Sequence, residues 1–551
     1  MRRAGSSVFE KTAPVAAFGT PQPAGAHNGP IKIDSGRLLG VSGRNPAIQV
    51  YKGIPYAAAP VGNLRWRAPQ RAPSWRGVRK ANAFGNDCMQ PSVSPASISA
   101  MVAEGKTPYS VEFSDYERPQ SEDCLYLNVW TPAKAPGEKL PVLVFIHGGA
   151  FVQGSGARPI YDGEDLASKG LVIVNINYRL GIFGFFAHPE LSRESKHKVS
   201  GNYGLLDQIA ALQWVHRNIA AFGGDPTNVT IDGRSAGAWS VNYLVATPLA
   251  RGLFSRAISV SSGGQFTPRR RSGLLQEVGA TPMLKDAEEF GVRFAKEEKA
   301  TSIAELRAIP AVDLMKAGAV LMGKAHYHPV VDRYVLPTDV YTIFASGKQQ
   351  DVPTMIGWTS GDGTTIRWSS GLPDTAAEYP TFVRQRFGPL AGEFRKAFGE
   401  VTSAADVSNA QAAFARDENY AWGSRAWGRL QAKTGKSNVY LYYWDHTPPV
   451  IESTKSFGAF HGSEDVYFHN TLNMWNLPWR AVDRHLADVM SSYRINFAKT
   501  GNPNGPRLPF WPNFTLYDER SMNLSETIGA IPTPHKPELD FLDDWYAKQR
   551  Q

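Results

Sequence analysis

The segment TIDGRSAGAWS, residues 230–240, places a serine between two glycines where a hydrophobic run ends. A serine hydroxyl is a weak nucleophile at neutral pH. It needs a base to accept its proton, a group to orient that base, and donors for the negative charge that develops. A sharp strand–turn–helix exposes such a serine and presents the next backbone N–H to the reacting oxygen. Ser235, flanked by Gly233 and Gly237, is therefore the candidate nucleophile.

A second glycine-bearing segment, FIHGGAF at residues 145–151, lies upstream of Ser235. It is at the end of an apolar run that is typical of a buried strand. Glycine-rich backbone in such a place can turn N–H groups toward a developing oxyanion. The alternative is an ordinary strand-to-loop turn. Its occurrence together with the serine turn favours the oxyanion interpretation.

A base should follow the serine late in the chain if the order of the catalytic groups is serine, acid, histidine. Among twelve histidines, His461 in AFHGSEDVYF is the best candidate, because the adjacent glycine allows its loop to approach another segment closely. His485 lies inside a helical pattern, and His446 and His469 lack such a loop.

The acid candidate is Asp362 in IGWTSGDGTTI, residues 356–366, just after a strand-like run. Aspartates among glycines often serve only to form turns, so the pattern by itself leaves this alternative open.

The elements that must position these groups alternate along the chain. Continuous apolar runs at 140–149 and 170–179 are typical of strands buried on both faces, and 228–233 is the next strand. Between them, 203–224 has apolar residues at helical spacing and ends at two glycines. This alternation predicts an α/β fold with a largely parallel sheet and helices on both faces.

Further along, the pattern predicts a hairpin at 31–43, strands at 125–132, 352–358 and 437–446, helices near 280–320 and 375–435, and a helix at 480–501. Without a repeat or a clear linker, one domain over 29–551 is expected. Residues 1–28, rich in Ala, Gly and Pro, are expected to be poorly ordered.

Composition narrows the function classes. The 551 residues are 42% hydrophobic and 20% charged, which is typical of a globular protein, and the net charge is +9. The basic run at 269–271 is interpreted as a solvated loop, because no arginine–aromatic repeat indicates nucleic acid. No apolar stretch is long enough for a membrane span. Two cysteines exclude a Cys-rich metal cluster, and no metal or cofactor is expected.

Several longer stretches carry a family resemblance that runs from about residue 30 to the C-terminus. They are YKGIPYAAAPVGNLRWRAP, SEDCLYLNVWTP, FIHGGAF, NYRLGIFGFF, GNYGLLDQIAALQWVHRNIAAFGGDPTNVTIDG, GRSAGA, AFHGSED and NFAKTGNPN. The chain resembles the type-B carboxylesterases, a family of α/β-hydrolases that includes cholinesterases and bacterial para-nitrobenzyl esterases. The resemblance implies a large, mostly parallel sheet with long excursions covering the active site.

The resemblance also assigns roles. Ser235 matches the nucleophile, His461 the base and Asp362 the acid, which is usually Glu in the family. The N–H groups of Gly149, Ala150 and Ala236 match the oxyanion hole.

Cys88 and Cys124 match the first disulfide of the family. That disulfide implies a periplasmic or secreted protein, although the N-terminus shows no clear signal peptide, and the cytoplasm stays the alternative.

Three departures from the family pattern matter. Ala150 stands where a third glycine is common, Asp362 is one methylene shorter than Glu, and Arg234 replaces a Glu just before the nucleophile. Arg234 is interpreted either as one partner of an ion pair or as a group that binds an anionic part of the substrate, with impaired catalysis as a third alternative.

Phe151 and Trp358 are candidate pocket residues, whereas Trp239, one helical turn beyond Ser235, is more typical of the core. The expected activity is hydrolysis of small-molecule carboxylic esters through an acyl-enzyme. An amidase or thioesterase with the same triad, and a catalytically silent cholinesterase-like binding protein, are the alternatives. The protein is expected to be a monomer or weak homodimer.

Overall fold

The computed structural model of the chain describes residues 29–91, 118–268, 281–320, 328–450 and 457–551. The expectations for residues 1–28 and for the basic run at 269–271 lie outside these ranges.

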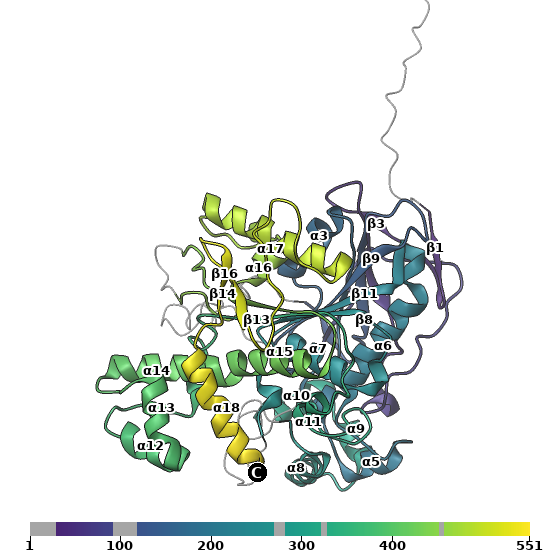
Figure 1. Cartoon of the computed structure of the whole chain (residues 1–551). Helices are drawn as coiled ribbons and strands as arrows, with labels where there is room; N and C mark the ends of the chain where they lie inside the picture. Colours follow the sequence, from purple (N-terminus) through teal and green to yellow (C-terminus); the bar gives the residue numbers. More distant parts are fainter. Residues whose placement is uncertain (1–28, 92–117, 269–280, 321–327, 451–456) are drawn as a thin grey trace, which may run out of the picture.

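An eleven-stranded sheet forms the centre of the molecule, with strand order β16-β15-β14-β13-β12-β11-β9-β10-β8-β4-β3. The seven strands from β15 to β10 pair in parallel, and the strands outside them pair antiparallel. The predicted α/β-hydrolase fold, with a large and mostly parallel sheet, is confirmed (Figure 1).

The strands of this sheet are β3 (Val41–Ser42), β4 (Gln49–Pro55), β8 (Tyr126–Thr131), β9 (Leu140–Ile146), β10 (Val172–Ile176), β11 (Gly224–Arg234), β12 (Arg256–Val260), β13 (Thr354–Thr359), β14 (Val439–Trp444), β15 (Arg520–Leu524) and β16 (Gly529–Pro532). A small three-stranded sheet contains β1 (Ile31–Ile33), β2 (Gly36–Leu39) and β5 (Val78–Lys80). A two-stranded sheet contains β6 (Asp87–Cys88) and β7 (Gln120–Ser121).

The helices in the described residues are α3 (Glu164–Ser168), α4 (Gly181–Phe185), α5 (Pro189–Glu194), α6 (Tyr203–Asn218), α7 (Ala236–Ala246), α8 (Leu284–Glu297), α9 (Ile303–Ala308), α10 (Ala311–Val320), α11 (Val340–Ala345), α12 (Tyr379–Phe387), α13 (Ala391–Phe398), α14 (Ala404–Arg416), α15 (Trp422–Thr434), α16 (Asp465–Phe468), α17 (Ala481–Thr500) and α18 (Lys536–Arg550). Helices lie on both faces of the sheet. In Figure 1, α3 and α17 lie above it, and α6, α7 and α15 lie below it.

Strand β9 shows why its apolar run is continuous. Side chains alternate between the faces of a strand. Val142, Val144 and Ile146 belong to the core that includes α6 and α7, whereas Leu143 and Phe145 belong to the core that includes α17. Because both faces are covered, no position in the middle of the strand can be polar without a partner.

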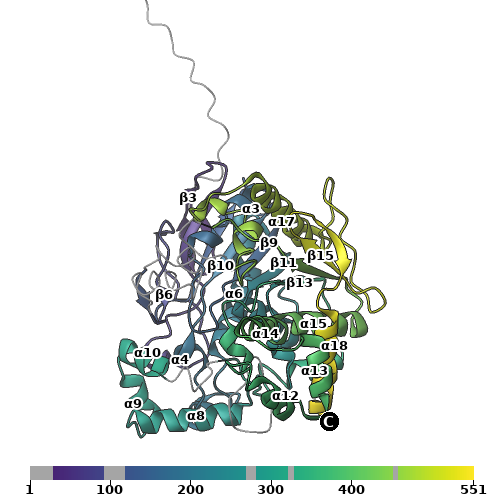
Figure 2. The same cartoon turned by 90° about the vertical axis from the view of Figure 1, so that its left-hand side faces the viewer.

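Two long excursions leave the sheet after β12 and after β13. The first contains α8 to α11 and the second contains α12 to α15, and both gather on one side of the molecule (Figure 2). They place helices beside the carboxyl ends of the parallel strands, the edge of such sheets where ligands bind.

Candidate active site

Ser235 lies on a strained turn between β11 and α7. Its backbone angles are φ 55° and ψ −123°, in a region that L residues rarely adopt, and its N–H donates to the Val260 carbonyl at 2.8 Å. Gly237 is required by close packing, because a Cβ there would lie 2.0 Å from the Ile146 carbonyl oxygen. The turn therefore leaves Ser235 partly exposed between neighbours that are buried.

His461 bridges the other two predicted groups. Its Nε2 lies 2.9 Å from Ser235 Oγ, and its Nδ1 lies 2.6 Å from Asp362 Oδ1. Asp362 is fully buried and His461 is 4% exposed. Three side chains from distant parts of the sequence thus form one hydrogen-bonded chain, in which an unprotonated Nε2 is placed to accept a proton from the serine.

The loops that carry the acid and the base are joined directly. Gly361 N–H donates to the Ala459 carbonyl at 3.0 Å, and the Thr359 N–H donates to Asp362 Oδ2 at 2.8 Å. These bonds fix both the place and the orientation of the carboxylate. They hold Asp362 within hydrogen-bond distance of His461.

The predicted oxyanion segment has an unusual backbone. Gly149, Ala150 and Phe151 all have positive φ, at 108°, 54° and 62°. Ala150 keeps the left-handed conformation although it is not glycine, which costs on the order of 1 kcal/mol. Ala236 is the first residue of α7, where N–H groups have no acceptor within the helix.

Arg234 does not face the serine hydroxyl. Its side chain is buried, with Nε 3.3 Å from Asp465 Oδ2 and Nη2 donating to the His461 carbonyl at 3.0 Å. This is the ion-pair alternative of the sequence interpretation. A guanidinium held in this way cannot also reach a substrate anion without breaking a buried pair, so we do not retain Arg234 as a substrate-binding residue.

Glu464 and Ser261 belong to the same buried cluster, and the sequence interpretation missed both. Glu464 Oε1 accepts from Ser261 Oγ at 2.8 Å, and its Oε2 accepts from the Gly462 N–H at 3.1 Å. Burial, followed by the charges of Asp465 and Asp362, raises the pKa of Glu464 well above its usual value, against the opposing effect of Arg234. The SED sequence after His461 was the only available signal.

The predicted pocket residues lie deeper than expected. Trp358 is fully buried on β13 and packs edge-on against Tyr443 at 5.9 Å between centroids, which is a core position. Phe151 is also fully buried and packs against Trp239 and the partly exposed His328, at 6.3 and 5.5 Å. Phe151 is therefore a buried packing residue within the predicted oxyanion segment. Trp239 is buried, as expected for the core.

Away from the serine, Cys88 and Cys124 form a disulfide. Within the residues that the structure describes, no group of three or more side chains could hold a metal ion. In the same part of the chain, no helix is long and apolar enough to cross a membrane.

Comparison with known proteins gives a match over nearly the whole chain. The model of the family described as "Carboxylesterase family" matches residues 27–542. A fumonisin B1 esterase of Sphingopyxis macrogoltabida is 35% identical over 505 residues, which cover 90% of this chain and 86% of that protein. A para-nitrobenzyl esterase of Bacillus subtilis is 33% identical, covering 90% of this chain and 94% of that protein.

Solved structures agree with these sequence matches. A carboxylesterase of Geobacillus stearothermophilus superposes with a TM-score of 0.76 at 32% identity, covering 93% of this chain and 99% of that structure. A structure of a PNB esterase gives a TM-score of 0.76 at 29% identity, covering 94% and 99%.

Proposed function

The chain belongs to the carboxylesterase family and hydrolyses carboxylic esters, and from that premise we propose that Ser235, His461 and Asp362 are its catalytic triad. One observation carries the proposal: His461 lies within hydrogen-bond distance of both Ser235 and Asp362, at 2.9 and 2.6 Å.

In the first half of the reaction, Ser235 Oγ attacks the ester carbonyl carbon while its proton passes to His461 Nε2. Asp362 accepts the Nδ1–H bond, which keeps the tautomer with a free Nε2 and stabilises the imidazolium that forms. His461 then returns the proton to the departing alkoxide, which leaves as the alcohol. The acyl group stays on Ser235 as an ester.

In the second half, His461 takes a proton from water, and the resulting hydroxide attacks the acyl-enzyme. Collapse of the tetrahedral intermediate releases the carboxylic acid and returns the proton to Ser235. In both halves negative charge develops on the carbonyl oxygen of the substrate. The N–H groups of Gly149, Ala150 and Ala236 donate hydrogen bonds to this oxygen and stabilise the charge. The left-handed backbone at Ala150 supports this role, because strain of this kind is kept where a conformation is needed.

Arg234 has a structural role in this proposal and does not bind the substrate. It holds the His461 carbonyl and neutralises part of the acidic charge beneath the base. Preference for an anionic substrate therefore finds no support in this residue, and neutral esters are the proposed substrate class.

The test is a rapid-mixing measurement with para-nitrophenyl acetate, followed by a panel of matched ester, thioester and anilide substrates. The expected result is a burst of nitrophenol equal to the enzyme concentration, absent in Ser235→Ala. Ser240→Ala, a buried serine on α7, is the matched control. Faster turnover of anilides or thioesters than of esters would overturn the proposed class, and the absence of any turnover would favour a binding protein. The panel should include fumonisin B1, the compound in the name of one relative.

We also propose that the protein works in the periplasm or outside the cell, because disulfides such as Cys88–Cys124 persist in oxidising compartments. Fractionation of the source cells should place the esterase activity there. Activity confined to the cytoplasm would contradict this location.

A further inference from the structure

The ring of Tyr420 faces the proposed base. The centroids of Tyr420 and His461 are 4.6 Å apart, with 33° between the ring planes, and Tyr420 is 8% exposed. The bonds to Ser235 and Asp362 hold the two edges of the ring that carry its nitrogens, and they act in the plane of the imidazole. The contact with Tyr420 acts on the face of the ring, so it limits tilting of the imidazole out of that plane.

Tyr420 lies in a π-helical turn, η8 (Asp417–Ala421), inserted between α14 and α15. The Trp422 N–H donates to the Asp417 carbonyl, a bond that spans five residues instead of the usual four. The turn therefore changes which side chains point toward the strand ends, while α14 and α15 continue almost in line (Figure 1). Such insertions are frequent at functional sites.

Backbone packing fixes this turn against the sheet. A Cβ on Gly423 would lie 1.8 Å from the Gly263 carbonyl oxygen, so the two backbones are in direct contact. Ser424 Oγ donates to the Ser262 carbonyl in the same place. Ser262 and Gly263 follow β12, the strand that pairs with the nucleophile strand β11. The position of Tyr420 is thus set by the same sheet that positions Ser235.

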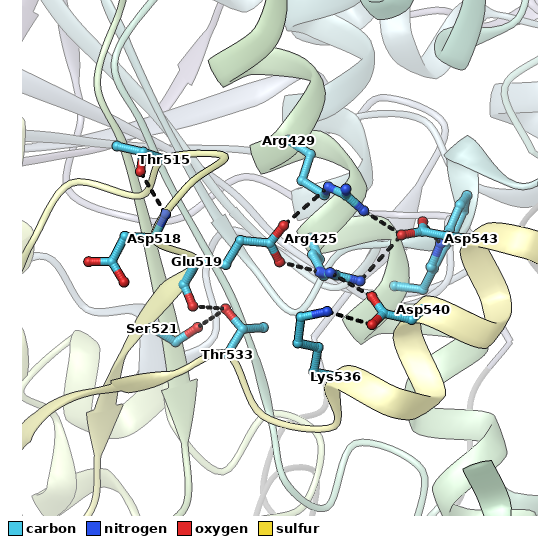
Figure 3. A network of polar contacts seen from close by, with 11 residues as sticks. Arg425, Arg429, Thr515, Asp518, Glu519, Ser521, Thr533, Lys536, Asp540 and Asp543 are labelled. Carbon is cyan, nitrogen blue, oxygen red and sulfur yellow. Dashed lines mark hydrogen bonds and ion pairs between the residues drawn. The ribbon is translucent and has the colours of Figure 1, made fainter. Parts of the chain in front are cut away.

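The C-terminal helix α18 holds the turn from the other side. Glu418 accepts from Tyr546 of α18 at 3.2 Å, and Trp422 Nε1 donates to Asp543 of α18 at 2.8 Å. Glu418 also accepts from Arg386 of α12 at 3.0 Å. Helix α18 is itself tied to α15 by Arg425, which contacts Asp540 and Asp543 (Figure 3).

We propose that Tyr420 is a positioning residue for His461: its ring holds the imidazole plane in the orientation that joins Ser235 to Asp362. This role rests on the triad proposed above. Tyr420 acts through His461, so its loss should lower the rate of acyl transfer and leave ester binding nearly unchanged.

The test compares Tyr420→Leu with Tyr420→Phe in steady-state and burst kinetics on para-nitrophenyl esters. Tyr420→Leu removes the ring and should lower kcat and the burst rate about tenfold, with KM changed less than about twofold. Tyr420→Phe keeps the ring and should restore kcat to within about threefold of the wild type. Tyr440→Leu, a buried tyrosine on β14 that packs against Phe497 and Trp511, is the matched control and should keep kcat.

A wild-type kcat in Tyr420→Leu would overturn the proposal, and so would a rise in KM at constant kcat, which would indicate contact with substrate. A tenfold loss in Tyr420→Phe as well would also overturn it, because the ring would then not be sufficient. If Tyr420→Leu does not fold, Tyr420→Met fills a similar volume without a ring and gives the same comparison. Failure of the triad is detected separately, since Ser235→Ala would then keep its burst.

Discussion

Two clusters of charged side chains join distant parts of this chain, and they differ in contact with solvent. Beneath His461, Arg234 meets Asp465 where both side chains are at most 6% exposed, next to the fully buried Glu464. Where α15 meets α18 and the segment before β15, Arg425 and Arg429 contact Glu519, Asp540 and Asp543 (Figure 3). Arg429 is 40% and Asp540 45% exposed, whereas Arg425 is 2% exposed.

The difference shows what each cluster can do. In the inner cluster a charge that loses its partner stays buried, so the partners must be present together and their geometry is fixed. At the exposed side chains of the outer cluster, such as Arg429 and Asp540, water replaces a lost partner at small cost, so their contacts contribute little individually. An active-site base needs the first kind of surroundings, whereas the attachment of a C-terminal helix can rely on many contacts of the second kind.

The largest expected effect comes from Arg234→Met. It leaves Asp465 buried without its cation and frees the His461 carbonyl, so unfolding free energy should fall by about 3–5 kcal/mol. The esterase kcat should fall at least about tenfold through misplacement of the base. Urea unfolding and steady-state kinetics measure the two effects.

The control for that variant is Arg234→Met combined with Asp465→Asn, which removes both charges and should recover part of the stability. A single substitution that costs less than about 1 kcal/mol would show that the inner pair behaves like a surface pair.

Arg425→Met tests a case intermediate between the two clusters, a buried cation whose partners are partly exposed. The side chain of Arg425 is 2% exposed, but the acids around it reach solvent, with Asp540 45% and Asp543 30% exposed. We therefore expect a loss of about 2 kcal/mol in unfolding free energy, smaller than for Arg234. A loss as large as that of Arg234→Met would mean that solvent does not replace the outer contacts.

Glu464→Gln should change the pH dependence of stability more than stability itself. The pKa of Glu464 is raised in the folded state, so the folded protein binds more protons than the unfolded chain above the usual pKa of Glu. This group therefore favours folding most at low pH, and its contribution falls as pH rises from about 4.5 toward the raised pKa. Glutamine imitates the protonated acid and should weaken this decline.

Unfolding free energies of wild type and Glu464→Gln at pH 5 and pH 8 measure this effect. Asp123→Asn, at a partly buried carboxylate that accepts from Tyr126, is a control outside the cluster. Identical pH dependence in wild type and Glu464→Gln would contradict a raised pKa at this site.

The smallest effect is expected for Arg429→Ala. Its exposed guanidinium contacts Glu519 and Asp543, and such pairs contribute about 0.2–1 kcal/mol. The loss should disappear at about 1 M salt, where exposed charges are screened within about 3 Å. If the loss in unfolding free energy persists at high salt, Arg429 behaves like a buried arginine, which would contradict this prediction.

Features that depend on local sequence were predictable, whereas contacts between distant segments were not. Ser235 and Asp362 lie in glycine-bearing turns after β11 and β13, and His461 lies in a glycine-bearing turn before α16. Local sequence records such turns. The strands and long helices were predicted because burial on one or both faces imposes a periodic pattern. The fold class followed from the alternation of these elements and from the family resemblance.

Contacts between distant segments were not predictable in this way. The partner of Arg234 is Asp465, and no local pattern joins them. Trp358 was predicted as a pocket residue, and only the structure shows that β13 is buried on both faces. Tyr420 reaches His461 only through a π-helical turn, and one inserted residue breaks the helical period instead of producing a pattern of its own.

The most direct test of the proposed triad is to identify the residue that acts as the nucleophile. The protein is mixed with a fluorophosphonate, digested and analysed by mass spectrometry, with His461→Ala in parallel. We expect one adduct per chain, on the peptide that contains Ser235, formed far more slowly in His461→Ala. An adduct on another residue, or equal labelling without His461, would contradict the proposed triad.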